Sequence, residues 1–70
     1  MTKISKEALE RLDEEMTALR DKLTKLSDFI YSSLVFKGLE LHDQNLLNLQ
    51  FSTMKTYYDI LKMRRERVEE

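Results

Sequence analysis

The first half of the chain carries an apolar stripe that repeats at steps of three and four residues without interruption. Steps that average 3.5 residues keep one narrow face of an α-helix turned toward a partner helix, as in a coiled coil. A second stripe follows in the other half, and only an arginine interrupts it. The two stripes are Leu9, Leu12, Met16, Leu19, Leu23, Leu26 and Ile30, and then Leu47, Phe51, Met54, Tyr58, Leu61, Arg65 and Val68.

The segment between the two stripes is poorly suited to a helix. It contains the Ser32–Ser33 pair, the β-branched Val35 and the only glycine, Gly38, and each of these lowers helix propensity. We therefore expect an all-α protein with a turn near its middle. The predicted organisation is one domain at residues 1–70, with a helix at about 5–32, a turn at about 33–40 and a helix at about 41–68.

The two stripes can be paired by their residue numbers. Residues that face each other in an antiparallel hairpin have a nearly constant sum of numbers, because the two chains run in opposite directions. Here the sums alternate between 73 and 74 over six layers, from Leu26 with Leu47 to Leu9 with Arg65. Helices of equal length with a short connection also favour this arrangement. The sequence thus predicts a coiled-coil-like antiparallel hairpin; the alternative, one continuous helix, requires residues 32–39 to stay helical.

A hairpin of this size needs further stabilisation. A chain of 70 residues buries little surface alone, and small folds usually need disulfides, a metal ion or other subunits. The chain has no cysteine and a single histidine, so association between copies is the remaining means. The second helix also has an apolar stripe that one partner helix cannot cover, and a further apolar cluster lies at the turn. We expect a homo-oligomeric bundle, at least a dimer, with an interface formed by Leu46, Leu49, Tyr57, Ile60, Met63 and Phe36.

The composition argues against several classes of function. Twelve Lys and Arg residues balance thirteen Asp and Glu residues, whereas general nucleic-acid-binding domains carry a basic excess. Glu40, His42 and Asp43 cluster near the second helix, but adjacent helical positions point in different directions and no second histidine is present. A catalytic triad cannot be assembled around a histidine that lies beside a loop. We expect no enzymatic activity, metal, cofactor, membrane or sequence-specific nucleic acid.

Basic and aromatic side chains gather toward the end of the second helix. Guanidinium groups bind phosphates in a bidentate manner, and tyrosine rings stack against bases. The alternative is that these cations pair with acids of the first helix. Arg65 stands out because it lies in the seam, the row of contacts between the two apolar stripes, opposite Leu9. Its guanidinium group can extend from there to an acidic side chain or to a bound anion. The candidate ligand-binding residues are Tyr57, Tyr58, Lys62, Arg64, Arg65 and Arg67.

The chain also resembles a known family. The resemblance covers about residues 10–68 and departs at 40–42, where the family has a serine cap and acidic residues. It is carried by the spacing of Leu39, Asp43, Gln44, Leu46, Leu47, Gln50, Met54, Tyr58, Leu61 and Arg65. This spacing is similar to that of small helical-hairpin proteins of tailed bacteriophages, named after a gene product of crAss-like gut phages.

This resemblance implies a phage accessory protein that acts in the cytoplasm of the bacterial host, and it transfers no catalytic residue. Small phage proteins often counter host immunity, and several helical oligomers of this kind sequester nucleotide immune signals. The implied function is sequestration of a host factor, such as a nucleotide signal held at subunit junctions. Two alternatives stay open: a module that binds a helix of a host or phage protein, and a role in virion assembly or structure.

Overall fold

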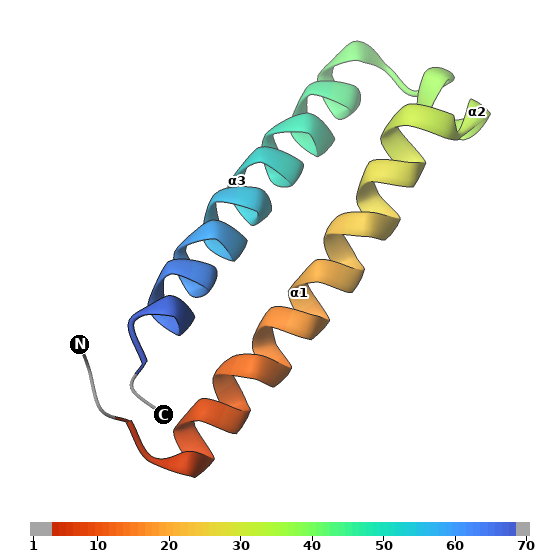
Figure 1. Cartoon of the computed structure of the whole chain (residues 1–70). Helices are drawn as coiled ribbons and strands as arrows, with labels where there is room; N and C mark the ends of the chain where they lie inside the picture. The colour runs from red at the N-terminus through yellow and green to blue at the C-terminus, as the bar shows by residue number, and fades with distance from the viewer. Residues whose placement is uncertain (1–3, 69–70) are drawn as a thin grey trace.

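The computed structural model describes residues 4–68, which form two long antiparallel helices joined by a short one (Figure 1). α1 spans Lys6–Ser32, α2 spans Leu34–Lys37 and α3 spans Leu41–Glu66. The long helices pack along each other over most of their length, and the Cα atoms extend over 47 × 15 × 13 Å. The described part of the chain is therefore a slender helical hairpin.

α1 begins directly after Ser5, close to the predicted start of the first helix at about residue 5. Ser5 has extended backbone angles, and its hydroxyl oxygen accepts a hydrogen bond of 3.1 Å from the backbone N–H of Ala8. This bond satisfies one of the amides that the start of a helix leaves unpaired. At the other end Ser33 turns the chain out of the helix with a ψ of 131°, while its N–H still donates to the carbonyl of Phe29 at 3.2 Å.

The connection contains a helix that the sequence does not predict. The Ser33 hydroxyl accepts a hydrogen bond of 3.1 Å from the backbone N–H of Val35, so the residue that ends α1 also caps α2. Gly38 then closes α2, and its N–H donates to the carbonyls of Leu34 and Val35 at 3.1 Å each. The expected turn at residues 33–40 is therefore a single helical turn between two capped ends.

Gln44 fixes the start of α3 from inside the helix. Glu40 precedes α3 but makes no side-chain cap hydrogen bond. The side-chain nitrogen of Gln44 instead lies 3.0 Å from the carbonyl oxygen of Phe36, 3.3 Å from that of Lys37 and 3.1 Å from that of Leu39. One amide group thus ties α3 to two carbonyls of α2 and to the carbonyl of Leu39 in the link that follows.

The main core lies between α1 and α3. Its buried centre consists of Leu12, Leu19 and Leu61, and Leu61 has no exposed surface. Partly buried side chains of the same two stripes surround this centre: Met16, Leu23, Met54, Tyr58 and Val68. The antiparallel pairing of the two predicted stripes is therefore confirmed. The core is only one side chain thick, because each helix contributes a single stripe.

The turn end of the hairpin has a small core of its own, which corrects one prediction. The sequence places Phe36 at an oligomer interface, but only 8% of this residue is exposed. Its ring meets that of Phe29 edge to face, with the ring centroids 5.9 Å apart. Phe36 is buried inside its own chain because α2 folds back over the end of α1. The exposed apolar residues at this end include Leu34 and Val35, at 80% and 66%.

Candidate functional site

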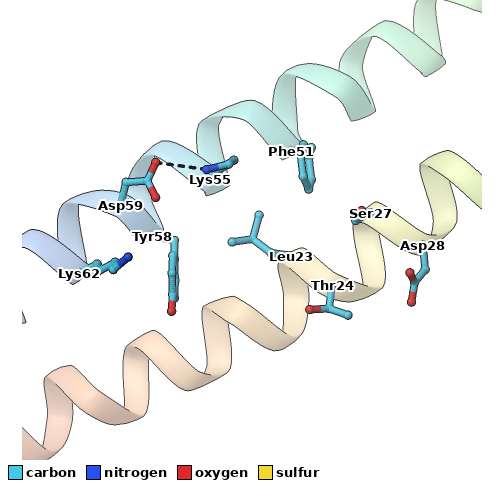
Figure 2. Close-up of a pocket in the computed structure, with 9 residues that line it drawn as sticks. All are labelled: Leu23, Thr24, Ser27, Asp28, Phe51, Lys55, Tyr58, Asp59 and Lys62. Atoms are coloured by element: carbon cyan, nitrogen blue, oxygen red, sulfur yellow. Dashed lines mark hydrogen bonds and ion pairs between the residues drawn. The ribbon is translucent and has the colours of Figure 1, made fainter.

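An open groove of about 460 Å³ runs along one flank of the seam between α1 and α3 (Figure 2). This volume lies in the range of pockets that hold small molecules. Both helices line the groove: α1 contributes Leu23, Thr24, Ser27 and Asp28, and α3 contributes Phe51, Lys55, Tyr58, Asp59 and Lys62.

The floor of the groove is apolar and aromatic. Figure 2 shows Leu23 pointing from α1 into the space between Phe51 and Tyr58 of α3. All three residues are partly buried, and Leu23 and Tyr58 pack against the main core. The core therefore holds these side chains in place, and their free faces offer a rigid surface for a planar ring.

Two of the four charged side chains of the groove lie at its opposite ends. Lys62 lies beside Tyr58 at one end, and Asp28 lies beyond Ser27 at the other (Figure 2). Between these ends, the Lys55 ammonium nitrogen lies 3.5 Å from a carboxylate oxygen of Asp59, and the two side chains are 61% and 52% exposed.

An ion pair that is so exposed is weak. Within residues 4–68, neither Lys62 nor Asp28 has an ion-pair partner. The groove thus offers a cation at one end, a carboxylate at the other and aromatic rings between them.

The structure distributes the six predicted ligand-binding residues over four places. Tyr58 and Lys62 line the groove. Arg64 and Arg67 line a smaller hollow of about 160 Å³ near the ends of the chain, whose other walls are apolar. The structure therefore brings only two of the six residues into the larger site.

The remaining two candidates have other surroundings. Arg65 donates a hydrogen bond of 2.8 Å from its Nε atom to a carboxylate oxygen of Asp13, so it joins α3 to α1. This contact is one of the two outcomes that the sequence leaves open for Arg65. Tyr57 lies on the outer face of α3 and is 42% exposed. Within one chain, neither residue lines the groove.

Sequence reasoning missed several residues of the groove, although their positions follow a simple rule. Almost every hydrophilic lining residue comes directly after a seam residue: Thr24, Ser27, Lys55, Asp59 and Lys62 follow Leu23, Leu26, Met54, Tyr58 and Leu61. In an antiparallel hairpin the positions that follow the seam on both helices open to the same flank. The pairing of the stripes could therefore have located this site before the structure was known.

Two other features concern metals and membranes. Among residues 4–68, no group of three His, Cys, Asp or Glu side chains is close enough to hold a metal ion. Glu40, His42 and Asp43 are all exposed. In the same part of the chain, no helix is both long enough and apolar enough to cross a lipid bilayer.

The predicted interface residues of α3 are exposed in the single chain. Leu46, Leu49, Tyr57, Ile60 and Met63 have exposed fractions from 42% to 63%. They lie away from the seam, on the outer face of the helix.

The fold and the groove together define a class: a small helical hairpin with a ligand-sized groove along its seam. A comparison with protein families matches residues 6–67 to the family described as Sequestin. The match spans all three helices and both walls of the groove. This chain belongs to the Sequestin family. No curated protein and no solved structure matches the chain.

Proposed function

We propose that this protein sequesters a small nucleotide-type ligand in the groove between α1 and α3, without converting it chemically. The observation that carries the proposal is the groove, in which aromatic rings lie between a lysine and a carboxylate. The family name Sequestin is compatible with a sequestering role. The target is a nucleotide immune signal of a bacterial host. The protein acts in the cytoplasm of that host as a counter-defence protein of a bacteriophage, as the family resemblance of the sequence implies.

Each part of a nucleotide has a counterpart in the groove. A base stacks on the ring of Tyr58 or Phe51, an interaction that contributes about 1–3 kcal/mol per base. A phosphate group lies at the end with Lys62, whose ammonium group acts as a point charge. A ribose hydroxyl or an amino group donates a hydrogen bond to Asp28 at the other end. A ligand with a phosphate, a planar ring and hydrogen-bond donors therefore fits better than a purely anionic one.

Assembly into a homo-oligomer is the second part of the proposal. The single chain leaves six large apolar side chains of α3 exposed to solvent. Exposed apolar stripes of this length usually mark contact surfaces. Association between copies covers the stripe and adds the buried surface that a chain of 70 residues cannot supply alone.

Isothermal titration calorimetry tests ligand binding directly. The probes are cyclic di-AMP, cyclic di-GMP, cyclic AMP and linear di-adenylate, each titrated into protein at a concentration on the order of tens of micromolar. We expect at least one probe to bind with one site per groove. The variant Lys62→Glu should weaken that binding by about tenfold or more, which corresponds to about 1.4 kcal/mol.

The variant Lys22→Glu is the matched control, because it makes the same charge change at an exposed lysine of α1 outside the groove. The absence of heat with every probe, or equal effects of the two variants, would reject nucleotide binding in the groove. Mass spectrometry of the ligand released by heating checks the other half of the proposal. The ligand should be recovered unchanged, and a converted product would mean that the protein is an enzyme.

The exposed stripe on α3 favours a second candidate function, a module that binds a helix of a host or phage protein. This candidate predicts a chain that remains monomeric on its own and is recovered with a specific protein from infected cells. A virion role predicts its presence in purified particles. Either result, together with no nucleotide binding, would replace the proposal above.

A further inference from the structure

The outer face of α3 carries a second seam that is as regular as the one inside the hairpin. Its members follow one another at steps of three and four residues: Leu46, Leu49, Thr53, Thr56, Ile60 and Met63. All six are exposed in the single chain. Such spacing turns one narrow stripe toward a partner helix.

This face of α3 also carries no charged residue between residues 45 and 63. Between residues 45 and 63, the charged residues of α3 are Lys55, Asp59 and Lys62, and all three line the groove on another flank of the helix. A surface stripe without a charged residue over so many positions is unusual for a helix that stays in water. Between residues 45 and 63, charge is therefore confined to the side of α3 that binds the ligand in our proposal.

The two threonines at the centre of the stripe can be buried at little cost. The Thr53 hydroxyl donates to the carbonyl of Leu49 at 2.9 Å, and the Thr56 hydroxyl donates to the carbonyl of Ser52 at 3.0 Å. Because each donor already has its partner within α3, burial leaves no donor unsatisfied. Their small size also allows a second helix to approach closely at this point.

The stripe is complementary to itself when its direction is reversed. An antiparallel pair centred between residues 54 and 55 brings large side chains against large ones at the ends and small against small in the middle. We propose that two copies pair in this way, α3 against α3, about a two-fold axis. The layers are Leu46 with Met63, Leu49 with Ile60, and Thr53 with Thr56. This inference rests on the assembly part of the proposed function and does not involve the ligand.

The flanking charges favour the antiparallel pairing over a parallel one. The antiparallel register brings Asp43 of one copy within about one helical turn of Arg64 of the second copy, on the same side of the contact. In a parallel register the stripe continues into Arg67, which would face Arg67 of the second copy. A parallel pair would bring Asp59 of one copy close to Arg64 of the second copy. However, Asp59 already forms an ion pair with Lys55 of its own chain, at 3.5 Å.

The pairing has a consequence for the groove. A two-fold axis between antiparallel helices is perpendicular to both, so equivalent flanks of the two α3 helices open to the same side. Both grooves then lie on one face of the dimer, and Ser52 of the second copy lies beside Asp59 at the rim of each groove. A parallel pair would place the grooves on opposite faces.

The molecular mass in solution tests the association, measured by light scattering after size-exclusion chromatography without any ligand. We expect twice the 8.4 kDa of one chain, or a multiple of that dimer. Thr53→Lys places a charge in the middle of the contact and should weaken association by about tenfold or more.

Thr17→Lys is the matched control, because Thr17 is an exposed threonine of α1 whose hydroxyl donates to the carbonyl of Asp13 at 3.0 Å. Circular dichroism confirms that both variants remain helical. A monomeric wild-type chain, or equal effects of the two variants, would overturn the proposed pairing. Neither result affects the calorimetric test with nucleotides, so the proposed pairing can be rejected while ligand binding is retained, and the reverse.

Disulfide trapping tests the register, because the chain contains no cysteine. Leu46→Cys and Met63→Cys lie 17 residues apart, or about 25 Å along a helix, whereas a disulfide needs Cα atoms within about 7 Å. Antiparallel pairing predicts a covalent dimer when the two variants are mixed and oxidised, and none with either variant alone. Covalent dimers of each single variant would establish a parallel register instead. A dimer that forms no cross-link in the mixture would also overturn the register.

Discussion

At the scale of single residues, Gly38 shows how the structure changes the role assigned to a residue type. A glycine at a turn suggests a left-handed backbone, yet Gly38 has a φ of −85° and a ψ of −7°, which any residue can adopt. A Cβ atom placed there would lie 3.6 Å from the carbonyl oxygen of Val35 and 3.7 Å from that of Leu34. These are ordinary contacts, so the turn does not need a glycine.

We therefore expect Gly38→Ala to raise the free energy of unfolding by about 0.4–1 kcal/mol, because alanine restricts the unfolded chain more than the folded one. Urea denaturation followed by circular dichroism measures the change. Gly38→Pro is the contrasting variant. It removes the N–H that donates to Leu34 and Val35, so it should destabilise the protein. A clear loss of stability in the alanine variant would contradict this account of the turn.

Arg65 is a charged residue in the apolar stripe of α3, and its guanidinium group pairs with Asp13 of α1. It interrupts an otherwise apolar stripe, and its side chain is 30% exposed against 50% for Asp13. The aliphatic part of the arginine covers the seam while its head reaches across to the carboxylate. Ion pairs with this degree of exposure contribute about 0–1 kcal/mol, so the ion pair with Asp13 adds little to the stability of the hairpin.

At the scale of secondary structure, the connection between α2 and α3 depends on Gln44. Its amide donates toward three carbonyl oxygens between 3.0 and 3.3 Å away. A carboxylate in the same place accepts but cannot donate. Gln44→Glu keeps the size of the side chain, removes the donor and brings a negative charge close to three carbonyl oxygens.

We expect Gln44→Glu to lower the free energy of unfolding by about 1–3 kcal/mol at neutral pH. Gln50→Glu is the matched control on the same helix, because Gln50 is exposed and its amide makes only a 3.8 Å contact with the sulfur of Met54. The control should change stability by less than about 0.5 kcal/mol. Urea denaturation of both variants decides the point, and equal effects would mean that Gln44 does not hold the connection.

At the scale of the whole molecule, stability rests on a core one layer thick. The buried apolar residues among those described are Leu12, Leu19, Ile30, Phe36 and Leu61. A small domain has little stability to lose, because the stability of typical domains is only about 5–15 kcal/mol. One core residue can therefore decide whether the hairpin folds.

Leu61→Ala should lower the free energy of unfolding by about 2–5 kcal/mol, because Leu61 is completely buried and its removal leaves a cavity between the helices. Leu41→Ala removes the same atoms from a side chain on α3 that is 71% exposed, and it should cost less than about 0.5 kcal/mol. Thermal unfolding compares the two variants. If both lose the same stability, the core is not where the structure places it.

Much of the hairpin could be predicted from local and periodic features. The seam, its pairing and the Ser5 cap were readable because each depends on residue types at fixed steps along one helix. The α2 helix was not, because the weak helix propensity of its residues is offset by local hydrogen bonds with Ser33 and Gly38 that the apolar spacing does not specify. The bridge from Gln44 was not, because its carbonyl partners meet the amide only after the chain has turned. The burial of Phe36 was missed for the same reason: its partner, Phe29, becomes available only when α2 folds back on α1.

The sequence by itself determined that the chain forms two helices with matching apolar stripes, because the spacing of side chains along a helix selects the buried face before any contact forms. Only the tertiary structure decided which cations remain in the groove and which are bound elsewhere. Lys62 lies beside Tyr58, whereas Arg65 reaches Asp13 on the other helix. These outcomes depend on how one helix is rotated against the other and on the directions of long side chains, neither of which is set by periodicity.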